Sequence, residues 1–333
     1  MTSITYIKER FDWIDSLRGI AMIIVMLWHI SNGISSQWLF SVFTSPIMIP
    51  LFFSITGYVF NDCKGNSTLF FKKLFFKLVI PWLGLSLGKA LVIALIRHSV
   101  EYFVEYSVGV ITGINLWYMP CCIVGEIIHY FVLKFSKNTY QITITSIALM
   151  ITGYFLAQYN ILDIMCINIA LVAQGYILIG YLIKSSTTIK TIIEKYIFAE
   201  VCLYFALGLI SVFAYKEMCM DVHKNSYYSW LICIPMIILG CVSCFSIAPK
   251  IEKHPKLLTF IGRNTLVFYI FHYDTIYPFE QLSNKIGIAL SGWSGVIVKF
   301  VWSLLICTII AIVLNRYMPQ LVGKKRIKSS PSN

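Results

Sequence analysis

Charged side chains are scarce in this sequence, and a long hydrophilic segment is absent from it. Only 13% of the 333 residues are charged, whereas 58% are hydrophobic. Soluble domains carry about 25% charged and about 45–50% apolar residues. This composition therefore excludes a soluble enzyme. Because no hydrophilic block separates the apolar runs, it also argues against a second, soluble domain.

Two further signals are missing. The residues before the first apolar run carry five charges, and that run lacks an A-x-A-like cleavage site, so we expect no cleavable signal peptide and a first span that stays in the protein. Nearly all of the ten cysteines fall inside apolar runs, without the company of other metal-ligating residues. We interpret them as small core residues and expect no metal site.

What the sequence has in abundance is apolar runs of membrane-spanning length. A hydrocarbon core of about 30 Å requires about 20 apolar residues per helix. Ten candidate spans meet that length: 17–34, 46–62, 76–96, 108–133, 141–158, 161–183, 195–215, 228–248, 258–278 and 294–316. The fold class predicted is an all-α polytopic integral membrane protein with about ten transmembrane helices.

The distribution of basic residues predicts an orientation. The net charge is +12, from 27 Lys and Arg against 15 Asp and Glu. Twenty of the 27 basic residues lie in the N-terminal segment, alternate loops and C-terminal tail, and only four lie in the other loops. This bias predicts cytoplasmic N and C termini. It also accounts for the net charge, so we expect no nucleic-acid partner.

The same pattern divides the chain into three parts. Residues 1–16 form a cytoplasmic N-terminal segment, and residues 17–318 form the transmembrane domain. Residues 319–333 are basic and contain Ser and Pro, which predicts a disordered cytoplasmic tail.

Polar side chains within the predicted spans are the candidate functional residues, because they are costly at that depth. His29 follows Arg18 by eleven residues, which is about 16 Å and about three helical turns, so both side chains share one face. Asp15 lies three residues before Arg18 and can pair with it. The alternative is that Arg18 only anchors the helix and His29 only forms an interhelical hydrogen bond.

Two further polar groups follow in the next spans. Ser54 and Thr56 lie between Pro50 and Gly57, which predicts either a bent helix with accessible backbone groups or close helix packing. Lys73 and Lys77 share one face by their i, i+4 spacing. Phosphate binding and helix anchoring use the same lysines, and the spacing does not separate the two roles.

The remaining candidates lie in the predicted spans 108–133 and 258–278. Glu126 and His129 are three residues apart, so they can share a proton or complete a polar cavity. Trp117 begins the first of these spans, where an interfacial aromatic belt is expected. In the second, Arg263 lies near the predicted cytoplasmic rim, and His272 lies deeper.

Four motifs, in order, resemble those of the membrane acyltransferase 3 family, and more closely its fucose 4-O-acetylase-like branch. Residues 12–19 followed by Trp28-His29 resemble the R-x10-H signature of that family. Residues 50–58 are similar to its P-L-F-F-x-x-S-G-Y element, with Thr56 where Ser is usual. Residues 116–119 resemble its L-W-F-L motif, and the segment from Gly262 to His272 resembles its G-x-x-[ST]…H element.

One motif departs from the family pattern. An R-x-x-R pair often precedes the third span, whereas here Lys77 matches its second member and Leu74 occupies the first, with Lys73 adjacent. The donor contacts carried over to this segment therefore rest on lysines in place of arginines.

The resemblance implies transfer of an acetyl group from cytoplasmic acetyl-CoA to a sugar hydroxyl of a surface polysaccharide or its lipid-linked precursor, in a bacterial inner membrane. Acetyl-CoA is then a co-substrate, without a metal, and membrane lipids or further copies of the chain are the other expected partners. His29 acts as general base or acyl carrier, since a buried neutral imidazole can take the hydroxyl proton.

The other residues receive supporting roles from the same resemblance. The catalytic group is His29, Arg18 and Asp15; the donor-binding group is Lys73, Lys77 and Arg263; the acceptor-binding or supporting group is Ser54, Thr56, Trp117, Glu126, His129, Asn264 and His272. A proton-coupled secondary transporter is the alternative function, because intramembrane His, Glu and Arg also form proton relays. We find no inverted repeat typical of many transporters. A lipid-flipping or structural subunit would leave the four motifs unexplained.

Overall fold

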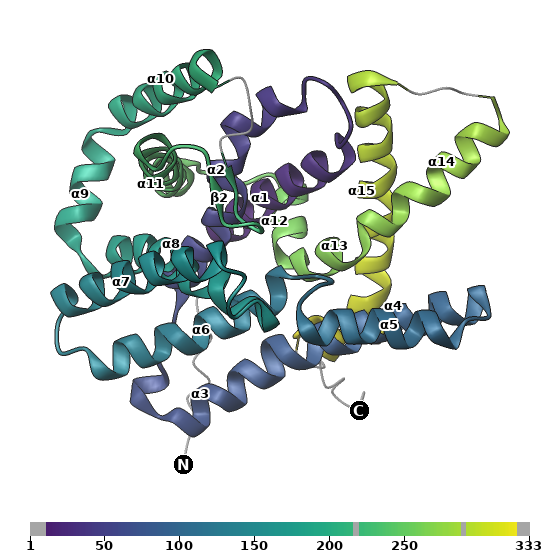
Figure 1. The fold of residues 1–333 in the computed structure, drawn as a ribbon, viewed down its shortest axis with the longest axis horizontal. Helices are drawn as coiled ribbons and strands as arrows, with labels where there is room; N and C mark the ends of the chain where they lie inside the picture. Colours follow the sequence, from purple (N-terminus) through teal and green to yellow (C-terminus); the bar gives the residue numbers. More distant parts are fainter. Residues whose placement is uncertain (1–10, 216–219, 288–290, 325–333) are drawn as a thin grey trace, which may run out of the picture.

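A computed structural model describes residues 11–215, 220–287 and 291–324. Most of these residues are helical, which confirms an all-α polytopic membrane protein (Figure 1). The helices are α1 (Asp12–Ile30), α2 (Gln37–Val59), α3 (Ser67–Leu74), α4 (Ile80–Arg97), α5 (Val100–Thr112), α6 (Tyr118–Phe135), α7 (Thr139–Gln158), α8 (Ile167–Ser185), α9 (Thr187–Lys195), α10 (Ile197–Tyr215), α11 (Trp230–Ile247), α12 (Lys256–Arg263), α13 (Thr265–Phe271), α14 (Ile276–Lys285) and α15 (Gly292–Tyr317). The short strands β1 (Met220–Asp221) and β2 (Ser226–Tyr227) form an antiparallel pair.

Within the described ranges, nine helices are long and apolar enough to cross a membrane. The predicted ninth span, 258–278, is broken into α12, α13, a 3-10 helix at Tyr273–Thr275 and the start of α14. The predicted span 108–133 is also divided, because α5 ends before Gly113, whose φ of 90° lies in the left-handed region that glycine adopts without strain. A separate helix, α6, begins at Tyr118.

The first helix begins at Asp12, earlier than the predicted boundary at residue 17. Two carboxylates, those of Asp12 and Asp15, lie in its first turn, where the helix dipole favours negative charge. Both also bind Arg263, as described below. These interactions explain why residues expected to precede the membrane domain form part of its first helix.

Two close helix crossings form the centre of the bundle. At the crossing of α1 and α12, a Cβ atom added to Gly262 would lie 1.7 Å from the carbonyl oxygen of Asp15. At the crossing of α2 and α8, a Cβ atom added to Gly180 would lie 1.7 Å from the carbonyl oxygen of Ser54. Only glycine permits such approaches. The main core, with Met26, Phe53 and Phe268 fully buried, lies between these helices and α13.

Helices α3 and α4 are parts of one long apolar element, Ser67–Arg97. They are joined by a π-helix at Phe75–Val79. A π-helix adds a residue to one turn and so changes the direction of the side chains on either side of it, often at a functional site. Lys77 lies within this segment.

Both ends of the described chain meet at one end of the bundle. Arg263, at the end of α12, binds Asp15, and the adjacent Asn264 accepts a hydrogen bond from Lys324 at 2.9 Å. We call this the Asp15 end. Pro319–Val322 form a 3-10 helix there, in place of the disorder expected from residue 319 onward; residues 325–333 of the predicted tail lie outside the described ranges.

Candidate functional site

The structure brings His29 and His272 together. His29 lies in the last turn of α1, and its ring centroid is 5.2 Å from that of His272. The ring of Tyr273 lies 6.0 Å from that of His29, nearly perpendicular to it. His272 is 3% exposed, whereas His29 is only half-buried. The pair therefore combines an accessible imidazole with an enclosed one.

The position of the pair along the bundle follows from α15. The hydroxyl of Ser303 donates to the carbonyl oxygen of His272 at 3.1 Å. With a rise of about 1.5 Å per residue, Ser303 lies about 17 Å from the first residue of α15 and about 21 Å from the last. The two histidines thus lie near the middle of the longest helix, close to the depth that the sequence predicts for His29.

Arg18, Asp15 and Arg263 form an ion-pair network at the Asp15 end. Asp15 is 2% exposed; it accepts a hydrogen bond from Nε of Arg263 at 3.0 Å and lies 3.7 Å from the guanidinium of Arg18. The predicted Asp15–Arg18 pair is therefore present. Arg263 also binds Asp12 at 2.6 Å, so two carboxylates neutralise the guanidinium that was predicted to bind the donor. These contacts tie α12 to α1.

Glu126, Lys77 and Arg18 lie near one another, although they belong to α6, the π-helix and α1. The carboxylate of Glu126 lies near enough to Lys77 and Arg18 for Coulombic attraction. We call these three residues the Glu126 cluster. Thr56 lies near Cys122 of α6, and its hydroxyl donates to the carbonyl oxygen of Phe52, one turn earlier in α2, at 3.1 Å.

Lys73 does not join Lys77. Its ammonium group donates to Sγ of Cys63 at 3.4 Å, in the segment between α2 and α3. The i, i+4 spacing would keep both lysines on one face of a regular α-helix, but Lys77 lies inside the π-helix, whose wider turn changes the direction of its side chain relative to that of Lys73. The two lysines therefore have different neighbours, and their joint role in donor binding stays a prediction.

Two other predicted site residues form hydrogen bonds within the packed helices. The hydroxyl of Ser54 is buried and donates to the carbonyl oxygen of Tyr176 at 2.9 Å, across the α2–α8 crossing. Asn264 donates to the carbonyl oxygen of Phe260 at 2.7 Å and accepts from Asn315 at 2.7 Å, which stabilises the break between α12 and α13. Of the alternatives for Ser54, close helix packing is the one that the structure shows.

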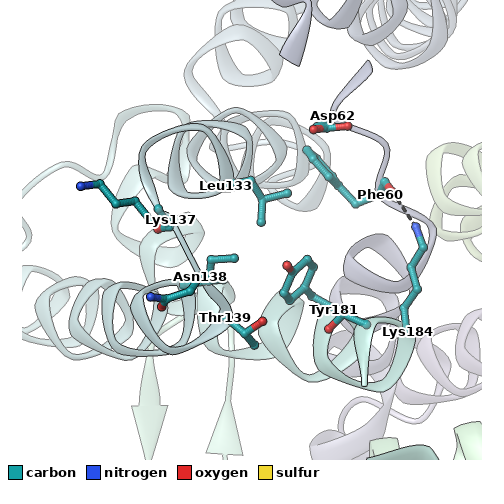
Figure 2. Close-up of a pocket in the computed structure, with 11 residues that line it drawn as sticks. Phe60, Asp62, Leu133, Lys137, Asn138, Thr139, Tyr181 and Lys184 are labelled. Carbon is teal, nitrogen blue, oxygen red and sulfur yellow. Dashed lines mark hydrogen bonds between the residues drawn. The ribbon is translucent and has the colours of Figure 1, made fainter. Parts of the chain in front are cut away.

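His129 lies apart from the histidine pair, behind a pocket at the Asp62 and Lys184 side chains. That pocket has a volume of about 530 Å³ and lies among the C-terminal ends of α2 and α8 and the α6–α7 loop (Figure 2). Phe60 and Tyr181 line it, and their rings lie 4.8 and 5.7 Å from the ring of His129. The ammonium of Lys184 donates to the carbonyl oxygen of Phe60 at 2.9 Å, as Figure 2 shows.

Neither ring nitrogen of His129 has a well-formed hydrogen bond among the described residues, although the amide of Gln174 lies nearby. The imidazole is fully buried. Glu126 instead lies near Lys77 and Arg18, so the structure places the two members of the predicted Glu126–His129 pair in different environments.

Trp117 lies against the β-hairpin. Its indole stacks on the imidazole of His223, with ring centroids 4.9 Å apart and planes 26° from parallel. Burial lowers the pKa of His223, and the nearby charge of Asp221 partly offsets this. The neutral imidazole is therefore favoured at this stack. The hairpin and its histidine were not identified from the sequence, because strands of two residues leave no periodic pattern.

Four residues near the histidine pair were missed in the sequence: Lys89, Tyr273, Asp274 and Ser303. Lys89 donates to Asp274 at 2.6 Å and is 6% exposed. A single charge inside an apolar run was the available signal for Lys89. The part of the chain that the structure describes contains no group of three His, Cys, Asp or Glu residues arranged to hold a metal ion.

Comparison with known protein families matches residues 11–312 to an acyltransferase domain. No curated protein and no solved structure matches the chain. The matched range begins before α1 and ends within α15, so it includes the histidine pair, the ion-pair network and the Glu126 cluster. The match covers nearly the whole chain, and the protein therefore belongs to the membrane acyltransferase 3 family.

Proposed function

We propose that this acyltransferase moves an acetyl group from acetyl-CoA to a sugar hydroxyl, as in the fucose 4-O-acetylase-like branch of the family. The observation that carries the proposal is the pairing of a half-buried His29 with an enclosed His272 near the middle of the bundle. A sugar hydroxyl is a poor nucleophile at neutral pH, so its acylation requires a base at this position.

The hydrogen bonds of His272 fix its tautomer. Its Nδ1 lies 2.8 Å from the carbonyl oxygen of Phe268 and 3.0 Å from that of Tyr269. Carbonyl oxygens only accept hydrogen bonds, so Nδ1 carries the proton and, in the neutral ring, Nε2 is an acceptor. Nε2 is buried and has no partner among the described residues. It is thus suited to accept the N–H of His29, which leaves the other nitrogen of His29 unprotonated.

The reaction then balances with His29 as the base. Its unprotonated nitrogen takes the proton of the sugar hydroxyl while the oxygen attacks the thioester carbonyl carbon. A C–O bond forms, the C–S bond breaks, and the thiolate leaving group receives the proton from His29 to give free CoA. His29 as a transient acyl carrier would require two such transfers.

The Glu126 cluster supports the proposed entry of the donor from the Asp15 end. Lys77 and Arg18 supply positive charge for the CoA phosphates there, and the charge bias of the loops favours a cytoplasmic Asp15 end. The acceptor, a surface polysaccharide or its lipid-linked precursor in a bacterial inner membrane, would approach from the opposite side. Trp117 offers an aromatic surface on that route.

The test is release of CoA by purified protein in liposomes, given acetyl-CoA and a panel of sugar acceptors. His29→Ala is expected to lower the acceptor-dependent rate by about 10²–10⁴-fold, the usual contribution of general acid–base catalysis. The matched control is His98→Asn. His98 directly follows the last residue of α4, and its φ of 52° is one that asparagine tolerates. If His29→Ala retains more than a tenth of the rate, the assignment of His29 is wrong.

A further inference from the structure

The helix that carries His272 is interrupted directly after it. α13 ends at Phe271, a 3-10 helix follows at Tyr273–Thr275, and α14 begins at Ile276. A break within a membrane bundle exposes backbone carbonyl groups that need donors, because lipid supplies none. The carbonyl oxygen of His272 accepts from the hydroxyls of Thr275 and Ser303 at 2.7 and 3.1 Å. The carbonyl oxygen of Ile270, two residues before His272, accepts its hydrogen bond from a side chain of another helix.

That donor is Lys89 of α4. Its ammonium group donates to the carbonyl oxygen of Ile270 at 3.0 Å and to the carboxylate of Asp274 at 2.6 Å. It also lies 4.9 Å from the ring centroid of Tyr106. One side chain therefore holds the positions two residues before and two residues after His272.

The surroundings make this contact a strong one. Lys89 and Asp274 line a cavity of about 610 Å³ between α4, α14 and α15, and most of its other lining residues are apolar, among them Ile306 and Ile310. Charges attract more strongly where little water screens them, and removal of one member of a buried pair leaves the other uncompensated. The ammonium group is 6% exposed and the carboxylate 35%.

The cavity lies on a different face of the broken helix from the histidine pair. Phe271, Asp274 and Thr275 line the cavity, whereas His272 and Tyr273 contact His29. Lys89 therefore reaches the site through the backbone of residues 270–274. This geometry places it behind the imidazole of His272, without direct access to a substrate at His29.

We propose that Lys89 is a positioning residue for acyl transfer. By binding both Ile270 and Asp274 it holds the broken helix in the form that keeps Nδ1 of His272 on the carbonyl oxygens of α13 and directs Nε2 toward His29. The inference rests on the proposed function of the histidine pair. It predicts an effect on the chemical step and little effect on donor binding, because Lys77 lies twelve residues before Lys89 on the same long element, roughly 18 Å away along its axis.

The experiment compares Lys89→Met with Lys299→Met in the full-length protein reconstituted in liposomes. Lys299 also forms an ion pair that reaches the broken segment, with Glu280 of α14 at 2.5 Å, but it does not bind residues 270–274. Lys89→Met is expected to lower kcat by about 100-fold, the loss that a displacement of about 1 Å can cause, with the KM for acetyl-CoA within about twofold of wild type. Lys299→Met should remain within about twofold in both constants. Lys89→Arg, which retains the charge and at least two donors, should recover most of kcat.

A double variant keeps the test decisive if Lys89→Met folds poorly. Lys89→Met combined with Asp274→Leu removes both charges, which is usually far less destabilising than removal of one. It still lacks the donor to Ile270, so its kcat should stay low; recovery of the wild-type kcat would overturn the proposal. Equal losses in Lys89→Met and Lys299→Met would also overturn it, as would a raised KM with unchanged kcat. A wild-type protein that releases no CoA would instead refute the proposed function, and the inference with it.

Discussion

Asp15, in the motif that precedes His29, has either a catalytic or a structural role, and the structure favours the structural one. Its carboxylate is 2% exposed and lies about 21 Å along α1 from His29, at a rise of about 1.5 Å per residue. It binds Arg263 and faces Arg18. We therefore predict that Asp15→Asn lowers the free energy of unfolding while leaving the turnover of folded molecules within about fivefold of wild type.

The magnitude follows from the contacts that are lost. A hydrogen bond to a charged group contributes about 1.5–3 kcal/mol, and breaking a fully buried ion pair costs about 3–5 kcal/mol. Arg263 is 39% exposed and keeps Asp12 as a second partner, so the lower range applies. The expected loss is about 2 kcal/mol. Asp12→Asn is the control: this carboxylate is 59% exposed, and an exposed pair contributes only about 0–1 kcal/mol.

The assay is denaturant unfolding in detergent micelles, followed by tryptophan fluorescence, with CoA release measured on the same preparations. Equal unfolding free energies for Asp15→Asn and wild type, together with a loss of kcat of about 100-fold or more, would refute the structural role and show that Asp15 takes part in catalysis. Equal destabilisation by Asp12→Asn and Asp15→Asn would show that burial of Asp15 does not determine the strength of the network.

Three further predictions concern the α2–α8 crossing, the β-hairpin and Lys77. Gly180→Val should prevent the α2–α8 crossing, because even a Cβ atom at this position would lie 1.7 Å from the carbonyl oxygen of Ser54. The yield of folded protein, measured by size-exclusion chromatography, should fall sharply. A normal yield would contradict the close packing of the two helices. Because burial lowers the pKa of His223, its contribution to stability is present above the unfolded pKa of about 6.5 and is lost as the pH falls through the folded pKa. The protection factors of the hairpin amides, which are exchange rates corrected for the intrinsic effect of pH, should therefore fall in acid for wild type but not for His223→Phe. Lys77→Gln alone should raise the KM for acetyl-CoA with little change in kcat. Lys73→Gln, which loses a contact to Cys63, should leave both constants unchanged. A raised KM in Lys73→Gln would show that both lysines bind the donor.

The amino-acid sequence by itself determined the class of the protein and the position of the candidate base, His29, along its helix. Apolar runs of the required length leave a membrane bundle as the only compact solution, and the eleven-residue spacing from Arg18 to His29 follows from the rise of an α-helix. The i, i+3 pair of Asp15 and Arg18 is equally local, and the structure contains it. Each of these features depends on neighbours within one helix.

The tertiary structure decided what each polar residue faces. The partner of His29 is His272, 243 positions later, and no spacing rule relates the two. A π-helix contains Lys77 but not Lys73, so the two lysines have different neighbours, and a helix break places Lys89 against the backbone beside His272. These outcomes depend on how backbone groups left without regular hydrogen bonds are satisfied by side chains of other helices, which is a property of the packed bundle rather than of any single segment.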